Sequence, residues 1–386
     1  MVCYFRLIDA LGAIPDPRRA RGRRFPLPYL LLFCVLAVLS GAKSFTHIVI
    51  FMRERREVLN QVFGSKFKSA PSINTVRLLL HAIGGEPLEA TARGYAEHLV
   101  SDGAARDALP LIALDGKTLR GSFDHINDRQ AVHTLSALAV AEKIVLAHFA
   151  VDGKTNEIPC VPALIRQLSL AGVIYTGDAM NCQKETFRAA AESNSYVLAQ
   201  VKGNQPTLLH TLEELANHRP PIDRCEVKDK IAHGRQERRR VETFDIAGSL
   251  GPDWDELVVT AARVTRLTWH KDTTDGMWTA STDSAIYLCQ KSLSAVDFGA
   301  AIRGHWEVEA HHYVRDVTLD EDASRIRISP LNFARLRTIA LNILRANGVK
   351  NVSQALFRNA LNLENILSYS TRVRSKAEQI QLVRIH

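Results

Sequence analysis

The spacing of apolar and polar residues divides the chain into a helical N-terminal part, a mixed central part and a helical C-terminal part. Over residues 1 to about 105, apolar positions recur at helical intervals. The longest apolar stretch, Leu27 to Ala42, has a continuous apolar run from Tyr29 to Leu39. That run is well short of the ~20 residues that a membrane-spanning helix needs, and no signal-peptide cleavage pattern follows it. We expect a buried core helix here and a further helix capped by Ser72.

From about residue 106 the spacing becomes that of short strands. The elements predicted in order are strands over 109–115, 131–140 and 143–151, a helix over 158–170, a strand over 173–178, a helix over 183–193 and a strand over 195–202. Three strands followed by alternating helix and strand indicate a mixed sheet covered by helices on both faces. This is the element order of the RNase H-like fold, in which the first and fourth strands lie side by side.

The pattern changes twice more before the C-terminus. Apolar and charged residues alternate over 222–290, which predicts a mainly β insertion. Helical spacing returns over 294–317 and 331–347. We therefore expect an α/β protein with a helical N-terminal domain (1–105), a catalytic domain (106–348) and a C-terminal tail (349–386).

Two aspartates stand at the ends of apolar runs in the central part. Asp115 follows LIAL and Asp178 follows VIYTG. A lone Asp before Gly more often begins a turn, but two acids in the same setting suggest a shared role. A carboxylate at the end of an interior strand stays charged only if a metal, a cation or several donors compensate it. On the expected sheet, Asp115 and Asp178 would meet at one edge.

A third acid comes from the helix predicted around Ile302 to Val317. Helical periodicity places Trp306, Glu309, His312 or Tyr313, and Asp316 on one face, while Glu307 points sideways. Three carboxylates are hard oxygen ligands suited to Mg²⁺ or Mn²⁺. Two such ions ~3.5–4 Å apart can promote in-line displacement at a phosphodiester.

Charge points to a polyanionic partner. Lys plus Arg number 49 against 41 acidic residues, a formal charge of +8. Five arginines cluster in the segment DPRRARGRR, namely Arg18, Arg19, Arg21, Arg23 and Arg24. They form either a solvated face or a phosphate-binding patch. Six cysteines without C-x-x-C spacing indicate no zinc cage or disulfide framework and favour a reducing cytosol.

Several motifs in fixed order resemble the DDE transposases of bacterial insertion sequences, of the H-repeat-associated (ISAs) type. They are DPRRARGRR, PSINTVR, ALDGKTLRGS, KTNEIP, TGDAMNCQ, KGNQ, HGRQERR, HWEVE, RDVTLDEDASRIR and NFARLRTIALNIL. The resemblance spans nearly the whole chain. It implies that Asp115, Asp178 and Glu309 form a triad that holds two Mg²⁺ or Mn²⁺ ions. Ala310 departs from the Asn common after this Glu, and Glu307 remains the alternative.

The resemblance also implies which basic residues contact DNA. Lys117 and Arg120 would contact the scissile strand or form a solvated turn, and Lys202 would reach the same groove. His305 stands where relatives often carry an Arg, whereas Asn204 and Gln205 are better explained by a turn. The β insertion, which holds transposon-end DNA in related transposases, carries His233, Arg235, Arg238, Arg239 and Arg240.

The expected function is binding of double-stranded DNA at terminal inverted repeats, followed by metal-dependent cleavage and strand transfer into target DNA. A homodimer or higher assembly would be needed to bring the two transposon ends together. We expect the protein to act in the cytoplasm, at the nucleoid, and to have no membrane partner. Two alternatives remain open: a degenerate copy that only binds DNA, and a structure-selective nuclease on the same fold.

Overall fold

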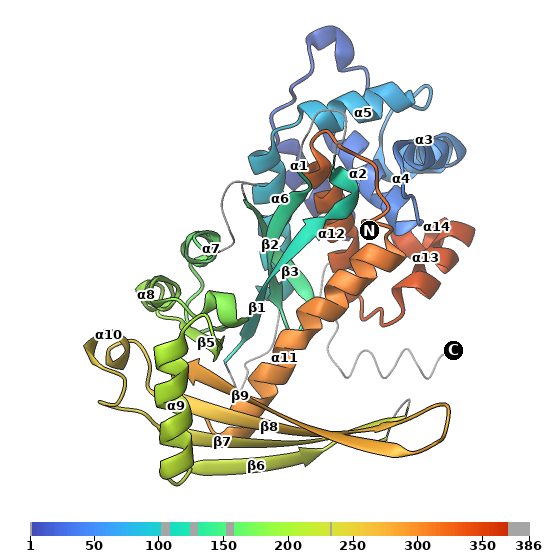
Figure 1. The fold of residues 1–386 in the computed structure, drawn as a ribbon. Helices are drawn as coiled ribbons and strands as arrows, with labels where there is room; N and C mark the ends of the chain where they lie inside the picture. Colours follow the sequence, from blue (N-terminus) through green and yellow to red (C-terminus); the bar gives the residue numbers. More distant parts are fainter. Residues whose placement is uncertain (1, 102–108, 124–129, 152–157, 232–233, 370–386) are drawn as a thin grey trace. The chain divides into compact units, whose positions relative to one another are not determined.

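The computed structural model describes residues 2–101, 109–123, 130–151, 158–231 and 234–369 (Figure 1). The chain forms two units. Unit 1 contains residues 1–106, 116–155 and 308–386, and unit 2 contains residues 107–115 and 156–307. These bounds differ from the expected divisions at 105/106 and 348/349, because the C-terminal helices complete the core of the N-terminal ones.

Unit 1 is mainly helical. Its helices are α1 (Val2–Gly12), α2 (Leu27–Leu39), α3 (Phe45–Glu54), α4 (Arg56–Phe63), α5 (Ile73–Ala82), α6 (Gly85–Ser101), α12 (Pro330–Ala346), α13 (Val352–Leu361) and α14 (Leu363–Leu367). The hydroxyl of Ser72 accepts a hydrogen bond from the backbone N–H of Thr75 at 3.1 Å, so the predicted cap of α5 is confirmed. The apolar stretch from Phe45 to Phe63 forms two helices, which are separated at Arg55.

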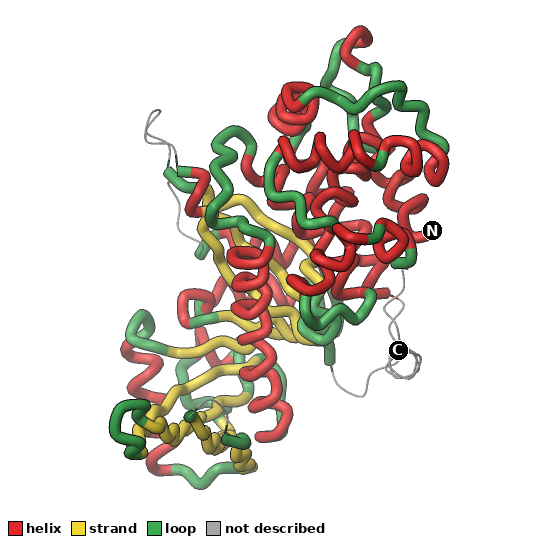
Figure 2. Tube along the Cα trace, turned by 90° about the vertical axis from the view of Figure 1, so that its right-hand side faces the viewer, coloured by secondary structure: helices red, strands yellow, loops and turns green. Residues whose placement is uncertain are grey.

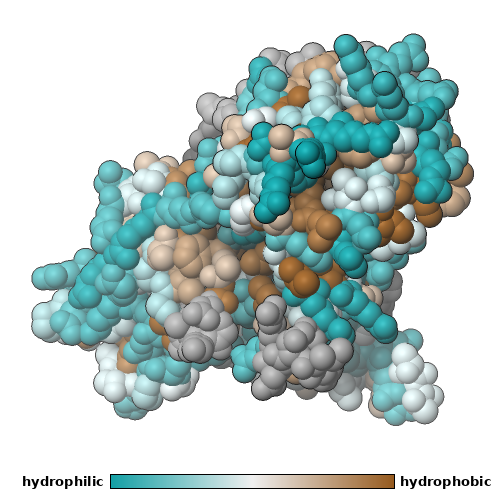
Figure 3. Space-filling model, turned by 90° about the horizontal axis from the view of Figure 1, so that it is seen from above, coloured by the Kyte–Doolittle hydropathy of each residue, from teal (hydrophilic) through white to brown (hydrophobic). Residues whose placement is uncertain are grey.

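The apolar helix α2 lies in the core of unit 1. Together with the preceding turn from Ala20, it is long and apolar enough to pass a test for a membrane span, yet from Leu30 to Leu39 every side chain is buried. On the face shown in Figure 3, hydrophobic residues occupy separate patches among hydrophilic ones. The expectation of a core helix is confirmed, because α1, α3 and α12 all pack against α2.

The C-terminal helices belong to the same core. The hydroxyl of Tyr4 donates to the carbonyl of Ile366 at 2.8 Å. The side-chain amide of Asn359 donates to the carbonyl of Leu39 at the end of α2, at 2.9 Å. The first part of the expected tail, as far as residue 367, therefore packs against the N-terminal helices and belongs to their core. Residues 370–386 lie outside the described residues.

Strand β1 (Leu111–Leu119) contributes to both units, and its part from Gly116 belongs to unit 1 with β2 (Val132–Ala139) and β3 (Ile144–Val151). The strands β2 and β3 form the predicted antiparallel hairpin. Helix α12 is joined to β3 by two bonds, since the Asn342 amide accepts from the N–H of Val145 at 3.0 Å and donates to its carbonyl at 2.8 Å.

Unit 2 contains a sheet in the order β1-β4-β5-β9-β8-β7-β6, and its strands are drawn in yellow in Figure 2. Its other strands are β4 (Ile174–Gly177), β5 (Tyr196–Val201), β6 (Asp223–Lys228), β7 (Arg235–Asp245), β8 (Thr260–Lys271) and β9 (Trp278–Cys289). The strands β1, β4 and β5 are parallel, and β9 runs antiparallel to β5. The predicted β insertion therefore continues the sheet of the RNase H-like fold and does not form a separate layer.

Helices cover both faces of this sheet. They are α7 (Cys160–Leu168), α8 (Lys184–Glu192), α9 (Pro206–His218), α10 (Pro252–Asp255) and the first part of α11 (Ala295–Tyr313). Phe298 and Ile302 of α11 pack into a core with Val241 and Val264. Helix α9 lies on the other face of the sheet from α11. Its residue Asn217 accepts a hydrogen bond from Arg263, which precedes Val264 on β8 and therefore points to the opposite face. The sequence pattern did not predict α9.

Candidate active site and nucleic-acid interface

Asp115 and Asp178 occupy matching positions of two neighbouring parallel strands in unit 2. The register between β1 and β4 pairs Leu111 with Ile174, Ile112 with Tyr175 and Ala113 with Thr176. Continued by two residues past the end of β4, the same register would bring Asp178 opposite Asp115. Neighbouring strands are ~4.8 Å apart, so this register predicts that the two acids are close neighbours. The predicted adjacency of the first and fourth strands is confirmed, although β1 continues past Asp115 to Leu119 where a turn was expected.

A short turn orients the carboxylate of Asp178. Its Oδ1 accepts hydrogen bonds from the backbone N–H groups of Met180 at 3.0 Å and Asn181 at 3.3 Å, and from the Asn181 side chain at 2.9 Å. Gly177 permits this close approach, because a Cβ atom at that position would lie 2.7 Å from the Cβ of Asn181. The three described bonds all end on Oδ1. They fix the direction in which the second oxygen of Asp178 projects.

The KGNQ motif supports the same turn from the end of β5. Asn204 donates a side-chain hydrogen bond to the carbonyl of Ala179 at 2.7 Å. Gln205 donates to the carbonyl of Cys182 at 3.1 Å. These two residues were expected only to form their own turn. They also hold the segment that follows Asp178, which explains why the two motifs occur together.

Helix α11 covers the sheet face toward which Asp178 projects. Ile174, Thr176 and Asp178 alternate onto one side of β4 and its extension. Ile174 belongs to the same core cluster as Phe298 of α11. Two residues after Ile174 on β4, the hydroxyl oxygen (Oγ1) of Thr176 lies 3.1 Å from Nδ1 of His305. His305 therefore anchors α11 beside the strand that ends at Asp178.

Glu309 follows His305 by one helical turn and is exposed. The exposed side chains of this helix include Trp306, Glu309 and Tyr313, whereas His312 is buried. Of the two residues predicted to share a face with Glu309, only Tyr313 is exposed like it. The alternative acid, Glu307, is half-buried and takes part in an interaction within the protein.

The donor chemistry of the aspartate pair suits a hard divalent cation. Carboxylate oxygens are the ligands that Mg²⁺ and Mn²⁺ prefer, and Asp115 and Asp178 supply them from adjacent strands. Among the described residues, no group of three or more His, Cys, Asp or Glu side chains could by itself hold a metal ion.

Two known protein families match most of the length of this chain. The family described as "Transposase DDE domain" matches residues 107–344, and the one described as "DDE_Tnp_1-associated" matches residues 8–96. The chain belongs to the DDE transposase family. The aspartates of adjacent strands β1 and β4 lie within the matched domain.

Relatives and one solved structure extend this comparison. The chain is 28% identical to "Putative transposase YncI" of Escherichia coli O157:H7, over 97% of each chain. It is 29% identical to "H repeat-associated putative transposase YhhI" of Escherichia coli K12, over 88% of this chain and 90% of the relative. A piggyBac transposase synaptic complex with hairpin DNA matches with 12% identity and a TM-score of 0.42, over 93% of this chain and 78% of that one.

Lys117 has a different position in this transposase from the one expected. It is 6% exposed, and its ammonium pairs with Asp316, with Glu321 at 3.3 Å and with Asp322 at 3.9 Å. Burial lowers the pKa of Lys117, which the carboxylate of Glu321 partly opposes. A buried ammonium with three acidic partners cannot also reach the scissile strand. We therefore correct its expected role from DNA contact to structural support.

Two other predicted contacts remain accessible. The side chain of Arg120 is 81% exposed and lies 3.7 Å from Asp322. Lys202, just after β5, is exposed as well. Exposure of this kind is compatible with phosphate contact, so both residues remain predictions.

The arginines of the β insertion do not form one patch. Side chains alternate along β7, so Arg235 and Arg239 lie on the face covered by α11, whereas Arg238 and Arg240 lie on the other face. Each of them also pairs with a carboxylate of the insertion. Glu237 pairs with Arg235 and Arg239, and Glu226 pairs with Arg238 and Arg240. This pairing reduces the charge available for DNA. His233 lies outside the described residues.

The N-terminal arginines are also partly engaged. Arg18 is held by both carboxylate oxygens of Asp16, at 2.9 and 2.8 Å, and donates to the carbonyl of Phe25. Its side chain is only 11% exposed, so its expected phosphate contact is corrected to a structural role. Arg23 bonds to two backbone carbonyls and Arg24 to Ser69. Arg19 and Arg21 are exposed.

A buried charged cluster in unit 1 was missed by sequence reasoning. The guanidinium of Arg315, which is fully buried, donates a hydrogen bond to Glu321 at 3.0 Å, and its Nε forms a second ion-pair contact with Glu321 at 3.0 Å. It also lies 3.0 Å from His148 Nε2. Burial lowers the pKa of His148 far below its usual value, and the nearby arginines add to this effect. The RDVTLDED motif carries Arg315 and Glu321, but no local pattern shows that residues with such charges are buried.

Proposed function

We propose that this transposase binds the terminal inverted repeats of its element, cleaves a phosphodiester at each end and transfers the exposed 3′ end to target DNA. The observation that supports this proposal best is the parallel pairing of β1 and β4, whose register, if continued by two residues, would bring Asp178 opposite Asp115. Two carboxylates on adjacent chain segments are suited to holding a divalent cation at a reacting phosphate.

Asp115, Asp178 and Glu309 are the residues that we propose to hold two Mg²⁺ or Mn²⁺ ions. When bound, such ions lower the pKa of the attacking group and neutralise charge that develops on the leaving oxygen. The protein residues orient this chemistry. The turn at Asn181 fixes the Asp178 carboxylate, and Asn204 holds the turn in place from β5.

Helical periodicity favours Glu309 over Glu307 as the third ligand. Phe298, Ile302 and His305 form the stripe of α11 that follows β4, at intervals of four and three residues. Glu309 continues this stripe after another four residues, whereas Glu307 is two residues from His305 and therefore on a different side of the helix.

The remaining contacts and partners follow from this role. Arg120, Lys202, His305, Arg19 and Arg21 are proposed to contact the DNA backbone, with a smaller contribution from the paired arginines of β7. Two transposon ends must be processed together, so the active species is proposed to be a dimer or larger assembly on DNA. It would act on the bacterial nucleoid in the cytoplasm.

The test is cleavage of a supercoiled plasmid that carries the element's own ends, with Mg²⁺ or Mn²⁺. Asp115→Asn, Asp178→Asn and Glu309→Gln should each lower the cleavage rate at least roughly 100-fold, because several kcal/mol of charge stabilisation depend on the ions. The matched control is Asp283→Asn, since Asp283 is 66% exposed and its ion pair among the described residues is with Arg266. Glu307→Gln should keep most of the activity.

Three results would contradict the proposal. Unchanged cleavage by Asp115→Asn and Asp178→Asn would exclude the metal site. Binding of the ends without any cutting by the unmodified protein would indicate a DNA-binding remnant. Cutting of branched DNA with no preference for the ends, and without strand joining, would indicate a structure-selective nuclease.

A further inference from the structure

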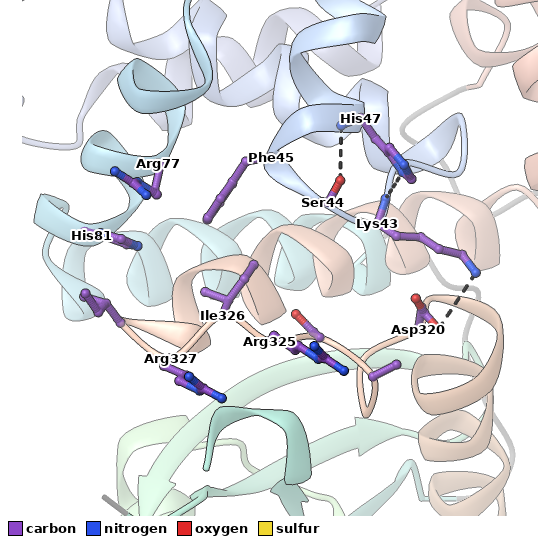
Figure 4. A pocket seen from close by; sticks show the side chains of 13 residues that line it. Lys43, Ser44, Phe45, His47, Arg77, His81, Asp320, Arg325, Ile326 and Arg327 are labelled. Atoms are coloured by element: carbon purple, nitrogen blue, oxygen red, sulfur yellow. Dashed lines mark hydrogen bonds and ion pairs between the residues drawn. The ribbon is translucent and has the colours of Figure 1, made fainter. Parts of the chain in front are cut away.

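A basic pocket of about 650 Å³ in unit 1 is not used by the proposed catalytic site (Figure 4). Three segments line it: the start of α3, the C-terminal part of α5 and the stretch between the π-helical turn Val314–Thr318 and α12. The residues that matter for its chemistry are Lys43, Phe45, Arg77, His81, Arg325 and Arg327. We call this pocket the basic groove.

The groove has more positive than negative charge. Lys43, Arg77, Arg325 and Arg327 face a single lining carboxylate, that of Asp320. Asp320 lies 3.9 Å from Lys43, and both side chains are at least 40% exposed, so their pairing is weak. For Arg77 and Arg325, no carboxylate oxygen of the described residues lies within 4.0 Å. The pKa of His81 is lowered by burial and also by the charge of Arg77.

This lack of pairing distinguishes the groove from the basic segments that the sequence suggested. Arg238 and Arg240 pair with Glu226, and Arg18 pairs with Asp16. Their charge is partly neutralised within the protein. Arg77 and Arg325 keep theirs, and both are exposed. A polyanion would therefore gain more from the groove than from the β7 arginines.

One wall of the groove is fixed to the segment that follows Asp115. The carbonyl of Ser324, a lining residue, approaches Gly121 so closely that a Cβ atom there would lie 2.1 Å from it. Glu321, next to Asp320, is held by Arg315 and Lys117 in the buried cluster. The stretch that carries Arg325 and Arg327 is therefore held in place from the DGKTLRGS motif.

We propose that the basic groove binds the sugar–phosphate backbone of duplex DNA. Its cations would contact phosphates, and the side chains of Phe45 and Ile326 would contact the sugars. Contacts of this kind position a duplex without reading its sequence. The inference rests on the proposed function, because the family relationship is what makes DNA the expected polyanion. The proposal gives the RDVTLDEDASRIR motif a role in binding the DNA substrate.

The experiment is fluorescence anisotropy of the full-length protein with a labelled mixed-sequence duplex, in EDTA and over a range of salt concentrations. The double variant Arg77→Gln/Arg325→Gln is compared with Arg188→Gln/Arg358→Gln, which removes the same charge from exposed arginines outside the groove. We expect the groove variant to bind at least about tenfold more weakly. The slope of log Kd against log salt should fall by about 2, since each lost phosphate contact removes ~0.9.

Several outcomes would overturn the inference. One is equal binding by the groove variant and its control when both keep the unmodified protein's melting temperature. Another is loss of binding only in Arg19→Gln/Arg21→Gln, which would place the backbone contact in the N-terminal arginines. Tighter, arginine-dependent binding of duplex RNA would exclude DNA as the ligand. The assay measures binding in EDTA, where no cleavage occurs, so a failure of the catalytic proposal can be distinguished from a failure of the groove.

Discussion

Replacing Glu321 by Gln tests whether the buried charged cluster stabilises unit 1. Glu321 is 2% exposed and accepts bonds from Arg315 at 3.0 Å, with the Lys117 ammonium 3.3 Å away. The substitution keeps the size of the side chain and removes its charge. Arg315 and Lys117 then remain buried, and only the more exposed Asp316 and Asp322 are left to compensate Lys117.

The expected loss follows from this burial. Removing one partner of a buried ion pair costs about 3–5 kcal/mol, because the other charge stays in the interior without compensation. The control Asp322→Asn removes a carboxylate that is 29% exposed and lies 3.9 Å from Lys117. Its cost should stay below about 1 kcal/mol, as for other solvent-accessible pairs.

Two spectroscopic signals separate the units during urea unfolding. All four tryptophans, Trp254, Trp269, Trp278 and Trp306, belong to unit 2, so their fluorescence follows that unit. Circular dichroism follows the helices, most of which are in unit 1. Glu321→Gln should lower the midpoint of the dichroism transition more than that of the fluorescence transition. An unchanged dichroism midpoint would refute the reasoning.

The pH dependence provides an independent check. Burial would raise the pKa of Glu321, but Arg315, Lys117 and Arg337 reverse this, and the pKa is lowered overall. A lowered pKa in the folded state means that the stabilisation is present above the unfolded value of about 4.5 and is lost as the pH falls through the folded value. The difference between the unmodified protein and Glu321→Gln should therefore shrink in acid.

Two further predictions concern unit 1. Gly121→Ala should destabilise unit 1 by about 1–3 kcal/mol, because the added Cβ meets the carbonyl oxygen of Ser324. Gly94→Ala in α6 should stabilise it by about 0.5–1 kcal/mol, because no atom lies within 4 Å of the added Cβ. Thermal melting checks both, since the two variants should shift the melting temperature in opposite directions. Buried His148 and His311 both have a strongly lowered pKa, so each should lower stability by at most about 1.4 kcal/mol per pH unit below pH 6.5, and His148→Gln should reduce the slope in urea titrations from pH 7.5 to 5. A slope that is the same in both proteins would show that His148 is not a titrating group.

The sequence predicted the strands well, because they depend on local patterns. Apolar runs of four to eight residues identify interior strands, and the element order then implies that β1 and β4 are neighbours. The prediction that Asp115 and Asp178 lie close together follows from that topology. The end of β1 was less predictable, since Gly116 and Lys117 resemble a turn until their burial is known.

The sequence was less informative about charged residues, since their role depends on tertiary partners. Lys117 and Arg18 look like phosphate ligands in a basic motif, yet both are paired with carboxylates and buried. Arg77 and Arg325 belong to no basic run, but the fold brings them to one groove. Charge density along a chain therefore indicates poorly which basic side chains are accessible and unpaired when nearby acids are equally dense.

The pairing of Tyr4 with Ile366 has a consequence for the order in which the protein can mature. Helices α1 to α6 leave the ribosome first, but α12 and α14, which complete their core, are made last. A nascent or truncated chain can contain Asp115 and Asp178 while the helices of unit 1 still lack their partners. Synthesis through α14 thus precedes completion of the core of unit 1, and copies that end before α12 should fold this unit poorly.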